Sequence, residues 1–233
     1  MRKNGMKREI LRSAFLRSLP VLAGYVLIGF GFGMVLRDAG FGLGWALAMS
    51  LLIYAGSMQY VGVSLLAAPA GLLTTLLTTV MINGRHLFYS ISMIGRYRDM
   101  GKYKPYLIFA LTDETYALLS DDSLKGQPPV YYFLVSLLNQ GYWMAGTALG
   151  SLLAAALPFD TSGVEFSMTA LFVAAYTEQW SSGTHRGPAA LGLAVTLVCR
   201  LLLGRDLFLI PAMGAITLIL LLAQPRKEAD HEA

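Results

Sequence analysis

Long apolar runs, separated by short polar stretches, dominate the chain. No charged residue lies between Asp38 and Arg85, and none lies from Gly126 to Phe159. A helix needs about 20 apolar residues to cross a bilayer, so each run can hold one or two spans. The runs are continuous and do not alternate over about ten residues, as the strands of a membrane barrel do. The pattern predicts an all-α, polytopic bundle of transmembrane helices with seven or eight crossings.

The predicted bundle occupies residues 18–223, with a first half at about 18–104 and a second half at about 130–223. A basic segment, residues 1–17, precedes it, and a polar tail, residues 224–233, follows it. The predicted spans cover these ranges: 20–36, 43–66, 72–95, 105–120, 130–157, 166–180, 187–203 and 207–223.

Composition supports a membrane protein. Hydrophobic residues make up 55% of the 233 residues, charged residues only 14%, and the mean hydropathy is +0.56. Soluble domains carry roughly a quarter charged residues. The net charge of +4 could suggest nucleic acid as a partner, but the basic residues cluster at the ends of apolar runs. Membrane orientation explains that placement better, so no nucleic-acid partner is expected.

The basic residues predict the orientation. The first 17 residues hold one acid, Glu9, against six basic side chains: Arg2, Lys3, Lys7, Arg8, Arg12 and Arg17. No small-residue cleavage site follows, so we expect a retained first span and a cytoplasmic amino terminus. The basic linker 95–104 is expected on the same side, and the acid-leaning linker 120–129 on the opposite side. Two markers on one side require an even number of crossings between them, which predicts a broken or re-entrant helix near Gly84.

An internal repeat is predicted at an offset of 120 residues. "GRHLFYSISM" at 84–93 aligns with "GRDLFLIPAM" at 204–213, and "LLIYAGSMQY" at 51–60 aligns with "LFVAAYTEQW" at 171–180. If the segment near Gly84 crosses twice, the second half starts on the other face and the repeat is inverted. Small residues in "GFGFG" at 29–33 indicate close helix packing. In secondary transporters, interrupted segments at equivalent positions indicate the substrate site.

Arg85, within "NGRHLFYS" at 83–90, is the first candidate for function. A charge near mid-membrane costs several kcal/mol unless it is paired, faces a water-filled cavity or binds an anion. An arginine beside a helix interruption at Gly84 could bind the carboxylate of an amino acid, with Asn83 as polar lining. The alternative is that Arg85 lies near the interface and reaches lipid phosphate.

Asp113 and Glu114 in "LTDETYAL" are the second pair of candidates. Adjacent helical positions diverge by about 100°, so at most one of them faces a given partner. Either acid could bind an ammonium group or carry a coupling proton, with Tyr116 nearby on the same helix. The alternative is an ion pair with Arg85, or a charged interfacial end of a span.

Glu178, Gln179 and Gln59 form the third group. Gln59 is the first-half counterpart of Gln179, Glu178 is a further coupling candidate, and both amides could equally bond helices together. His86 could ligate a metal, but the three histidines show no ligand spacing, so no metal and no other cofactor are expected. No nucleophile or phosphate-loop motif is present.

"SLLIYAGSMQY" at 50–60, "NGRHLFYS" at 83–90 and "LTDETYAL" at 111–118 resemble the AzlC-type branched-chain amino acid exporter family. The likeness covers roughly residues 20–220, although a bulkier apolar residue is common in the family at the position of Gly84. The resemblance implies export of leucine, isoleucine, valine or analogues, and a separate small AzlD-type membrane subunit.

These observations together predict a non-enzymatic, multi-pass permease of the inner membrane that exports hydrophobic amino acids, with proton coupling. The substrate-binding residues expected are Gln59, Asn83, Gly84, Arg85, Asp113, Glu114, Tyr116 and Gln179. Two alternatives stay open. The chain could be an integral-membrane enzyme that uses His86, Asp113 and Glu114, or an assembly subunit that does not itself transport.

Overall fold

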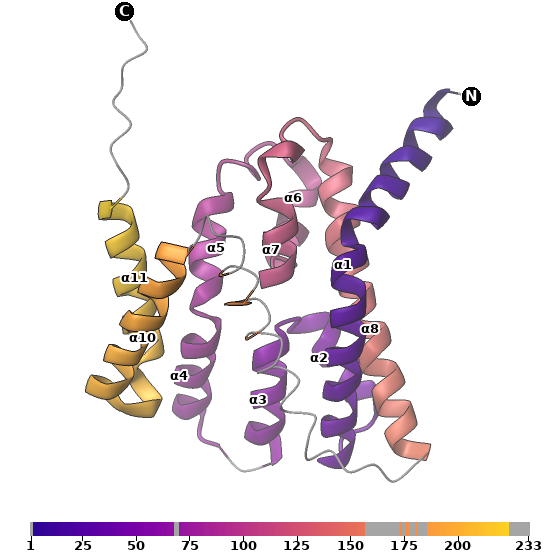
Figure 1. The fold of residues 1–233 in the computed structure, drawn as a ribbon. Coiled ribbons are helices and arrows are strands. Elements are labelled where there is room, and N and C mark those ends of the chain that lie inside the picture. The colour runs from indigo at the N-terminus through magenta and orange to yellow at the C-terminus, as the bar shows by residue number, and fades with distance from the viewer. Residues whose placement is uncertain are drawn as a thin grey trace, which may run out of the picture. The chain divides into compact units, whose positions relative to one another are not determined.

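The chain is helical wherever the structure describes it. The computed structural model describes residues 2–67, 70–156, 173, 176–177, 180 and 186–223, and no strand occurs within these ranges. The chain divides into two compact units, unit 1 (Met1–Leu171) and unit 2 (Phe172–Ala233). Figure 1 shows the helices of each unit. The predicted all-α class is therefore confirmed.

Helices α1 (Arg2–Asp38) and α8 (Pro129–Ala156) lie side by side in unit 1 and run in the same direction (Figure 1). The contacts advance by four residues along both helices, from Val26 with Gly146 to Phe30 with Gly150. The two helices are therefore parallel. At a rise of 1.5 Å per residue, both helices exceed the roughly 30 Å hydrocarbon core of a bilayer.

Glycines allow α1 and α8 to approach closely. A Cβ atom on Gly29 would lie only 2.8 Å from the carbonyl oxygen of Trp143, and Gly33 is even more tightly covered by Thr147. Small residues permit such backbone contact between membrane helices. The close packing predicted for residues 29–33 is confirmed.

Helices α2 (Leu43–Leu52) and α3 (Gly56–Ala67) form a hairpin that begins and finishes at the end of unit 1 where α1 stops (Figure 1). Residues 53–55 break the helix, and Tyr54 has a φ of +43°, which is in the left-handed region. Each arm is roughly 15 to 18 Å long, about half of a bilayer core. The single span predicted for residues 43–66 is therefore wrong.

Helices α4 (Leu72–Asn83) and α5 (Arg85–Met93) meet at Gly84 and continue in one direction (Figure 1). Gly84 has a φ of −53° and a ψ of −31°, which are ordinary helical angles. Together the two helices are long enough to cross a bilayer core. The chain does not turn back here, so the re-entrant alternative predicted near Gly84 is wrong, whereas the predicted break lies at the boundary between α4 and α5.

Helices α6 (Lys104–Phe109) and α7 (Asp113–Leu119) form a second hairpin, which approaches from the opposite end of unit 1 (Figure 1). The turn at 110–112 separates two arms of only about two turns each, so neither can span a bilayer. Two short 3-10 helices, η1 (Gly101–Tyr103) and η2 (Asp122–Leu124), flank this hairpin. The span predicted for residues 105–120 is therefore also a hairpin.

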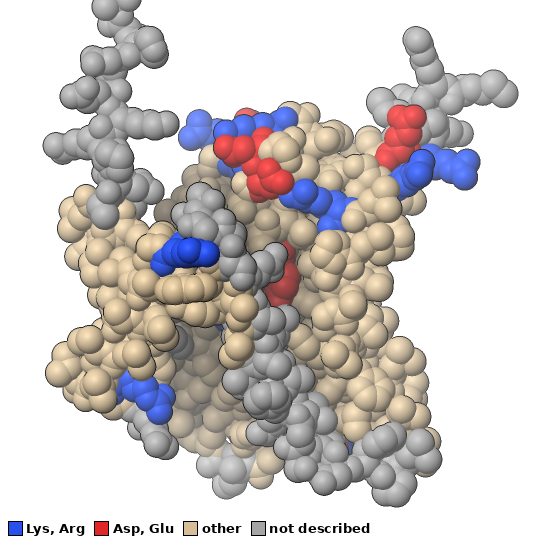
Figure 2. Space-filling view, in the orientation of Figure 1, with Lys and Arg blue, Asp and Glu red and all other residues tan. Residues whose placement is uncertain are grey.

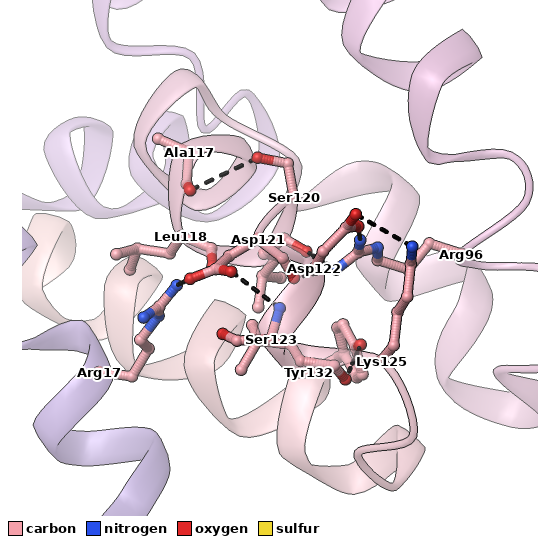
Figure 3. A network of polar contacts seen from close by, with 12 residues as sticks. Arg17, Arg96, Ala117, Leu118, Ser120, Asp121, Asp122, Ser123, Lys125 and Tyr132 are labelled. Atoms are coloured by element: carbon pink, nitrogen blue, oxygen red, sulfur yellow. Dashed lines mark hydrogen bonds and ion pairs between the residues drawn. The ribbon is translucent and has the colours of Figure 1, made fainter. Parts of the chain in front are cut away.

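The loop after α7 is held by arginines from two other segments (Figure 3). Arg17 of α1 donates to the Asp121 carboxylate at 2.5 Å and to the Leu118 carbonyl oxygen at 3.1 Å. Arg96 donates to the Leu119 carbonyl oxygen at 2.8 Å and to the Asp122 carboxylate at 2.9 Å. We call this end of unit 1, with Arg17, Arg96, Asp121 and Asp122, the polar end.

The polar end corrects the predicted position of the acidic linker. Linker 120–129 was expected on the side opposite to the amino-terminal segment and to linker 95–104, but Arg17 and Arg96 bind it directly. The acids compensate the arginines there, and acidic residues have little influence on orientation. On the visible face, most of the charged atoms of unit 1 gather at this end (Figure 2).

The ionic network at the polar end depends on pH. The backbone N–H of Ser123 and the Arg17 guanidinium both donate to the Asp121 carboxylate and lower its pKa to about 2. Contacts with Lys125 and then Arg96 lower the pKa of Asp122. Because these pKa values are depressed, the contacts stabilise the fold above the ordinary pKa of aspartate and lose strength as the pH falls towards the folded values.

Unit 2 contains helices α10 (Arg186–Leu207) and α11 (Leu209–Ala223). Gly204 interrupts α10 with a φ of +78°, whereas Gly84, its partner in the predicted repeat, is helical. Two helical stretches of the described chain are long and apolar enough to cross a membrane, Arg8–Asp38 and Arg186–Gly204. The internal repeat and the seven or eight crossings stay predictions. If α8 is the counterpart of α1, however, the two halves begin in the same direction.

Candidate functional site

A central cavity of about 210 Å³ lies where both hairpins of unit 1 approach α4 and α5. It is lined by the first break (Ile53, Tyr54 and Ala55), by the α4–α5 junction (Asn83, His86 and Ser90) and by the second break (Ile108, Phe109 and Leu111). The rings of Tyr54 and Phe109, one from each hairpin, are 6.2 Å apart. This volume is smaller than the roughly 300 to 1,000 Å³ of pockets for drug-sized ligands, and it suits a small metabolite.

Arg85 and Asp113 form an ion pair; neither residue lines the cavity, but Asn83 and His86 of its lining lie on either side of Arg85 in the sequence. Arg85 Nη1 lies 2.8 Å from Asp113 Oδ2, and Arg85 Nη2 donates to Ser57 Oγ at 2.8 Å. The two charged side chains are only 21% and 25% exposed, so neither extends into bulk solvent. The alternative predicted for Asp113, an ion pair with Arg85, is therefore the one observed. Ser57 joins α3 to the pair, so three elements converge here.

Asp113 and Glu114 face different partners. Asp113 points towards α5, whereas the Glu114 carboxylate accepts a hydrogen bond from the Tyr25 hydroxyl of α1 at 2.6 Å. The same hydroxyl lies 2.6 Å from Thr112 Oγ1. Thr112 caps α7 by accepting from the Thr115 backbone N–H, which orients both acids at the start of the helix. The predicted divergence of the two acids is confirmed.

Two amides in the middle of α8, Asn139 and Gln140, were missed by the sequence analysis. Asn139 Nδ2 donates to Thr115 Oγ1 of α7 at 3.0 Å. Gln140 Nε2 lies 3.4 and 3.3 Å from the carbonyl oxygens of Ser50 and Leu51, at the end of α2. Adjacent side chains of one helix thus reach both hairpins. Paired amides in a long apolar run were the signal that could have revealed them, because buried amides need partners.

Gln140 also fixes α6. Tyr106 donates its hydroxyl hydrogen to Gln140 Oε1 at 2.7 Å, so one amide connects the last carbonyl groups of α2 with the other hairpin. A broken helix leaves backbone carbonyl groups without partners, and in a membrane each one must be satisfied. Gln140 supplies that partner at the first break.

The other predicted site residues lie around this centre. Gln59 is fully buried, but it turns away from Arg85 and donates to Ser50 Oγ at 3.2 Å. Tyr116 stacks on Tyr89 of α5, with ring centroids 4.8 Å apart. Asn83 and Gly84 lie at the junction next to Arg85. Glu178 and Gln179 lie outside the described residues.

The residues of the enzyme alternative do not converge. His86 Nδ1 lies 3.1 Å from the Asn83 carbonyl oxygen, Asp113 pairs with Arg85, and Glu114 binds Tyr25. Among the described residues, no three His, Cys, Asp or Glu side chains are grouped as a metal site would require.

Fold and site together define a helical membrane protein in which two interrupted helices face a small cavity of mainly apolar lining, and interrupted helices at a binding site are common in secondary transporters. The model of the family described as "AzlC protein" matches residues 20–157, and the chain belongs to this family. No solved structure matches the chain.

Several relatives are similar over nearly their full length. An uncharacterized membrane protein of Helicobacter pylori (strain J99) is 39% identical, over 94% of this chain and 97% of that one. The branched-chain amino acid transport protein AzlC of Bacillus subtilis is 36% identical, over 99% of this chain and 92% of that one. The inner membrane protein YgaZ of Escherichia coli is 28% identical over 67% of each chain. The chain is therefore a membrane protein, as predicted.

Proposed function

We propose that this protein exports branched-chain or similar hydrophobic amino acids across the inner membrane in exchange for protons, together with a small AzlD-type subunit. One observation carries the proposal. A small cavity lies where two half-length hairpins from opposite ends meet, and its lining residues Asn83 and His86 lie on either side of Arg85, which forms a partly buried ion pair with Asp113. The relative from Bacillus subtilis, named as a branched-chain amino acid transport protein, supports the choice of substrate.

An amino acid zwitterion is complementary to this ion pair. Its carboxylate would replace Asp113 as the partner of Arg85, and its ammonium group would replace Arg85 as the partner of Asp113. The exchange leaves no net charge uncompensated, which matters because an unpaired buried charge is expensive. Tyr54, Phe109 and Leu111 would cover the aliphatic side chain. An apolar pocket separates substrates that differ by one methylene by only about 1 to 3 kcal/mol, so leucine, isoleucine and valine should compete.

Protonation of Asp113 would supply the coupling. The neutral acid no longer attracts an ammonium group, so proton binding and substrate binding would exclude each other, as antiport requires. Glu114 is the second candidate, because its described hydrogen-bond partner, the Tyr25 hydroxyl, is neutral. Polar lining would come from Asn83 and Gln59, and within the described residues Gln59 Oε1 is buried without a hydrogen-bond partner. We also propose that four further residues lie around the substrate: Gly84, Tyr116, Glu178 and Gln179.

The proposed orientation places the polar end in the cytoplasm. The basic amino-terminal segment and linker 95–104 both belong to that end, and lysine and arginine are enriched in cytoplasmic loops.

The test is counterflow of labelled leucine in proteoliposomes, with and without the small subunit. Wild type should accumulate leucine, and an imposed pH gradient should drive it uphill. Asp113→Asn should lose uphill transport, whereas Asp122→Asn, the same substitution at the exposed polar end, should keep it. Absence of leucine counterflow by wild type with the verified subunit present would refute the proposal.

A further inference from the structure

A second cavity, of about 140 Å³, lies next to the central one, and we name it the side cavity. The two cavities share three lining residues, Ser90 of α5, Ile108 of α6 and Leu111 of the second break. Because one set of side chains forms a wall of both, the two spaces are neighbours separated only by those side chains.

The side cavity extends the central cavity towards the polar end. Its remaining lining residues are Met93 and Ile94 at the end of α5, Tyr97 in the following turn, and Lys104 at the first position of α6. Residues 94–104, which include Arg96, connect α5 to α6 at the polar end. The two cavities therefore follow α5 and α6 from the α4–α5 junction, at Asn83 and His86, to the loops of the polar end.

The chemistry of this course indicates what could travel along it. Its walls are mainly aliphatic and aromatic, with Ser90 as the small polar residue in the middle. Among the described residues, Lys104 and His86 are the lining residues that can carry positive charge, one in each cavity, and no described acidic residue lines either of them. Lys104 is exposed, so its ammonium group can meet a solute at the polar end.

We infer that the two cavities form a route between the polar end and the α4–α5 junction for a small carboxylate-bearing solute with an aliphatic side chain. Lys104 would be an outer subsite for the carboxylate, and Ser90 lies in the wall that the two cavities share. This inference rests on the proposed function for the identity of the solute. The course itself depends only on the two cavities. A solute that carries a cationic side chain is disfavoured on this route, since nothing along the lining offers it an acid.

Cysteine labelling tests the route independently of transport. Cys199 is the only cysteine, so Cys199→Ser provides a cysteine-free background by one substitution. In that background, Ser90→Cys tests the shared wall. Ile91→Cys, one position further along α5, is the matched control, because Ile91 is 65% exposed on the apolar surface of the helix. Lys102→Cys, in the exposed loop of the polar end, reports which side a reagent reaches.

A membrane-impermeant thiol reagent should modify Ser90→Cys from the same side as Lys102→Cys, at least about tenfold faster than Ile91→Cys, because thiolate formation requires water. Leucine should slow the modification of Ser90→Cys and leave that of Lys102→Cys unchanged. Modification of Ser90→Cys no faster than Ile91→Cys would overturn the route, whatever the transport assay shows. Modification of Ser90→Cys from the opposite side only would overturn it as well.

A blocking variant separates the route from the proposed function. Ser90→Trp should reduce leucine counterflow at least tenfold while Ile91→Trp leaves it intact, and Lys104→Gln should raise the KM for leucine with little change in maximal rate. Full counterflow by Ser90→Trp would overturn the route while the proposed function stands. If wild type shows no leucine counterflow but Ser90→Cys is still modified as described, the route stands and the proposed substrate falls.

Discussion

The two hairpins of unit 1 reach the same cavity from opposite ends, but different chemistry stabilises their breaks. At the α2–α3 break the partner of the free backbone carbonyl groups is neutral: Gln140 binds those of Ser50 and Leu51, and Tyr54 adopts a left-handed conformation. A charged group, Arg85, contacts the Ser57 side chain just after the break. At the α6–α7 break the side chain of Thr112 caps the next helix, and Asp113 and Glu114 follow directly. The α2–α3 break is held by the amide of Gln140, and the α6–α7 break carries two acidic side chains.

This difference indicates that the first break has a structural role and that the second break carries the ionisable groups. The neutral break is satisfied from α8, so its backbone is fixed by a helix that packs tightly on α1. The acidic break binds side chains of α1 and α5 through hydrogen bonds and an ion pair that protonation can change. We therefore expect substitutions at the first break to affect mainly stability, and substitutions at the second break to affect mainly transport.

The largest expected effect is at the ion pair. Arg85→Met should abolish leucine counterflow and destabilise the protein by about 3 kcal/mol, because it leaves Asp113 buried without its charge partner. The double variant Arg85→Met/Asp113→Leu should recover part of that stability and still fail to transport. Thermal unfolding in detergent and counterflow in liposomes measure the two properties. Counterflow by the double variant would show that the ion pair only holds the helices together.

The next largest effect is expected for Gln140→Leu, which should lower the stability of the protein. It removes the partner of two backbone carbonyl groups and of the Tyr106 hydroxyl, and each buried polar group left unsatisfied costs about 1 to 3 kcal/mol. The matched control is Ser136→Ala on the same helix, since Ser136 Oγ is buried without a hydrogen-bond partner in the described part of the chain. Loss of transport without loss of thermal stability would contradict the supporting role of this amide.

The sequence predicted those features of the fold that depend on local residues better than those that depend on contacts between distant segments. The even number of crossings between the basic markers indicated that one segment must return, and one does. However, the return was placed at Gly84, where the backbone keeps helical angles and the chain continues in one direction. Glycine can remain helical in a membrane where neighbouring groups satisfy the backbone. The segment that does return breaks at Tyr54, and the residues around Tyr54 show no strong sequence pattern for a break. Its causes are Gln140 and the packing of α8, almost 90 residues away in the sequence.

The charged residues near the breaks were easier to identify from the sequence than the breaks themselves. Arg85, Asp113 and Glu114 were identified because charges are expensive in apolar runs, and a cost of that kind is visible in the sequence. Asn139 and Gln140 were missed because they carry no charge and lie in a run that otherwise predicts an uninterrupted span. The position of the acidic linker was also wrong, since its pairing with Arg17 and Arg96 joins segments far apart in the chain.

Thr112 tests the cap of the acidic break. Thr112→Val keeps the shape of the side chain but removes the hydroxyl group that accepts from the Thr115 N–H and meets Tyr25. A lost cap costs about 1 kcal/mol, and the reoriented acids should also lower the rate of counterflow. Thr112→Ser retains the hydroxyl group and is expected to behave as wild type. Equal behaviour of the valine and serine variants in both assays would exclude a role for the cap.

The smallest expected effect is at the polar end, where the ionic contacts are more exposed than the ion pair of Arg85 with Asp113. Asp121, with its pKa lowered to about 2, should stabilise unit 1 at neutral pH and lose this effect as the pH falls from about 4 towards 2. Arg17→Gln removes one of the causes of that shift, so the thermal midpoint of the variant should decrease less than that of wild type over the same pH interval. Leucine counterflow at neutral pH should be unchanged, because Arg17 contacts the loop after α7 and lies outside the lining of the central cavity. A parallel decrease of both thermal midpoints would show that other acids dominate the pH dependence, and a loss of counterflow would show that this network also controls access to the cavity.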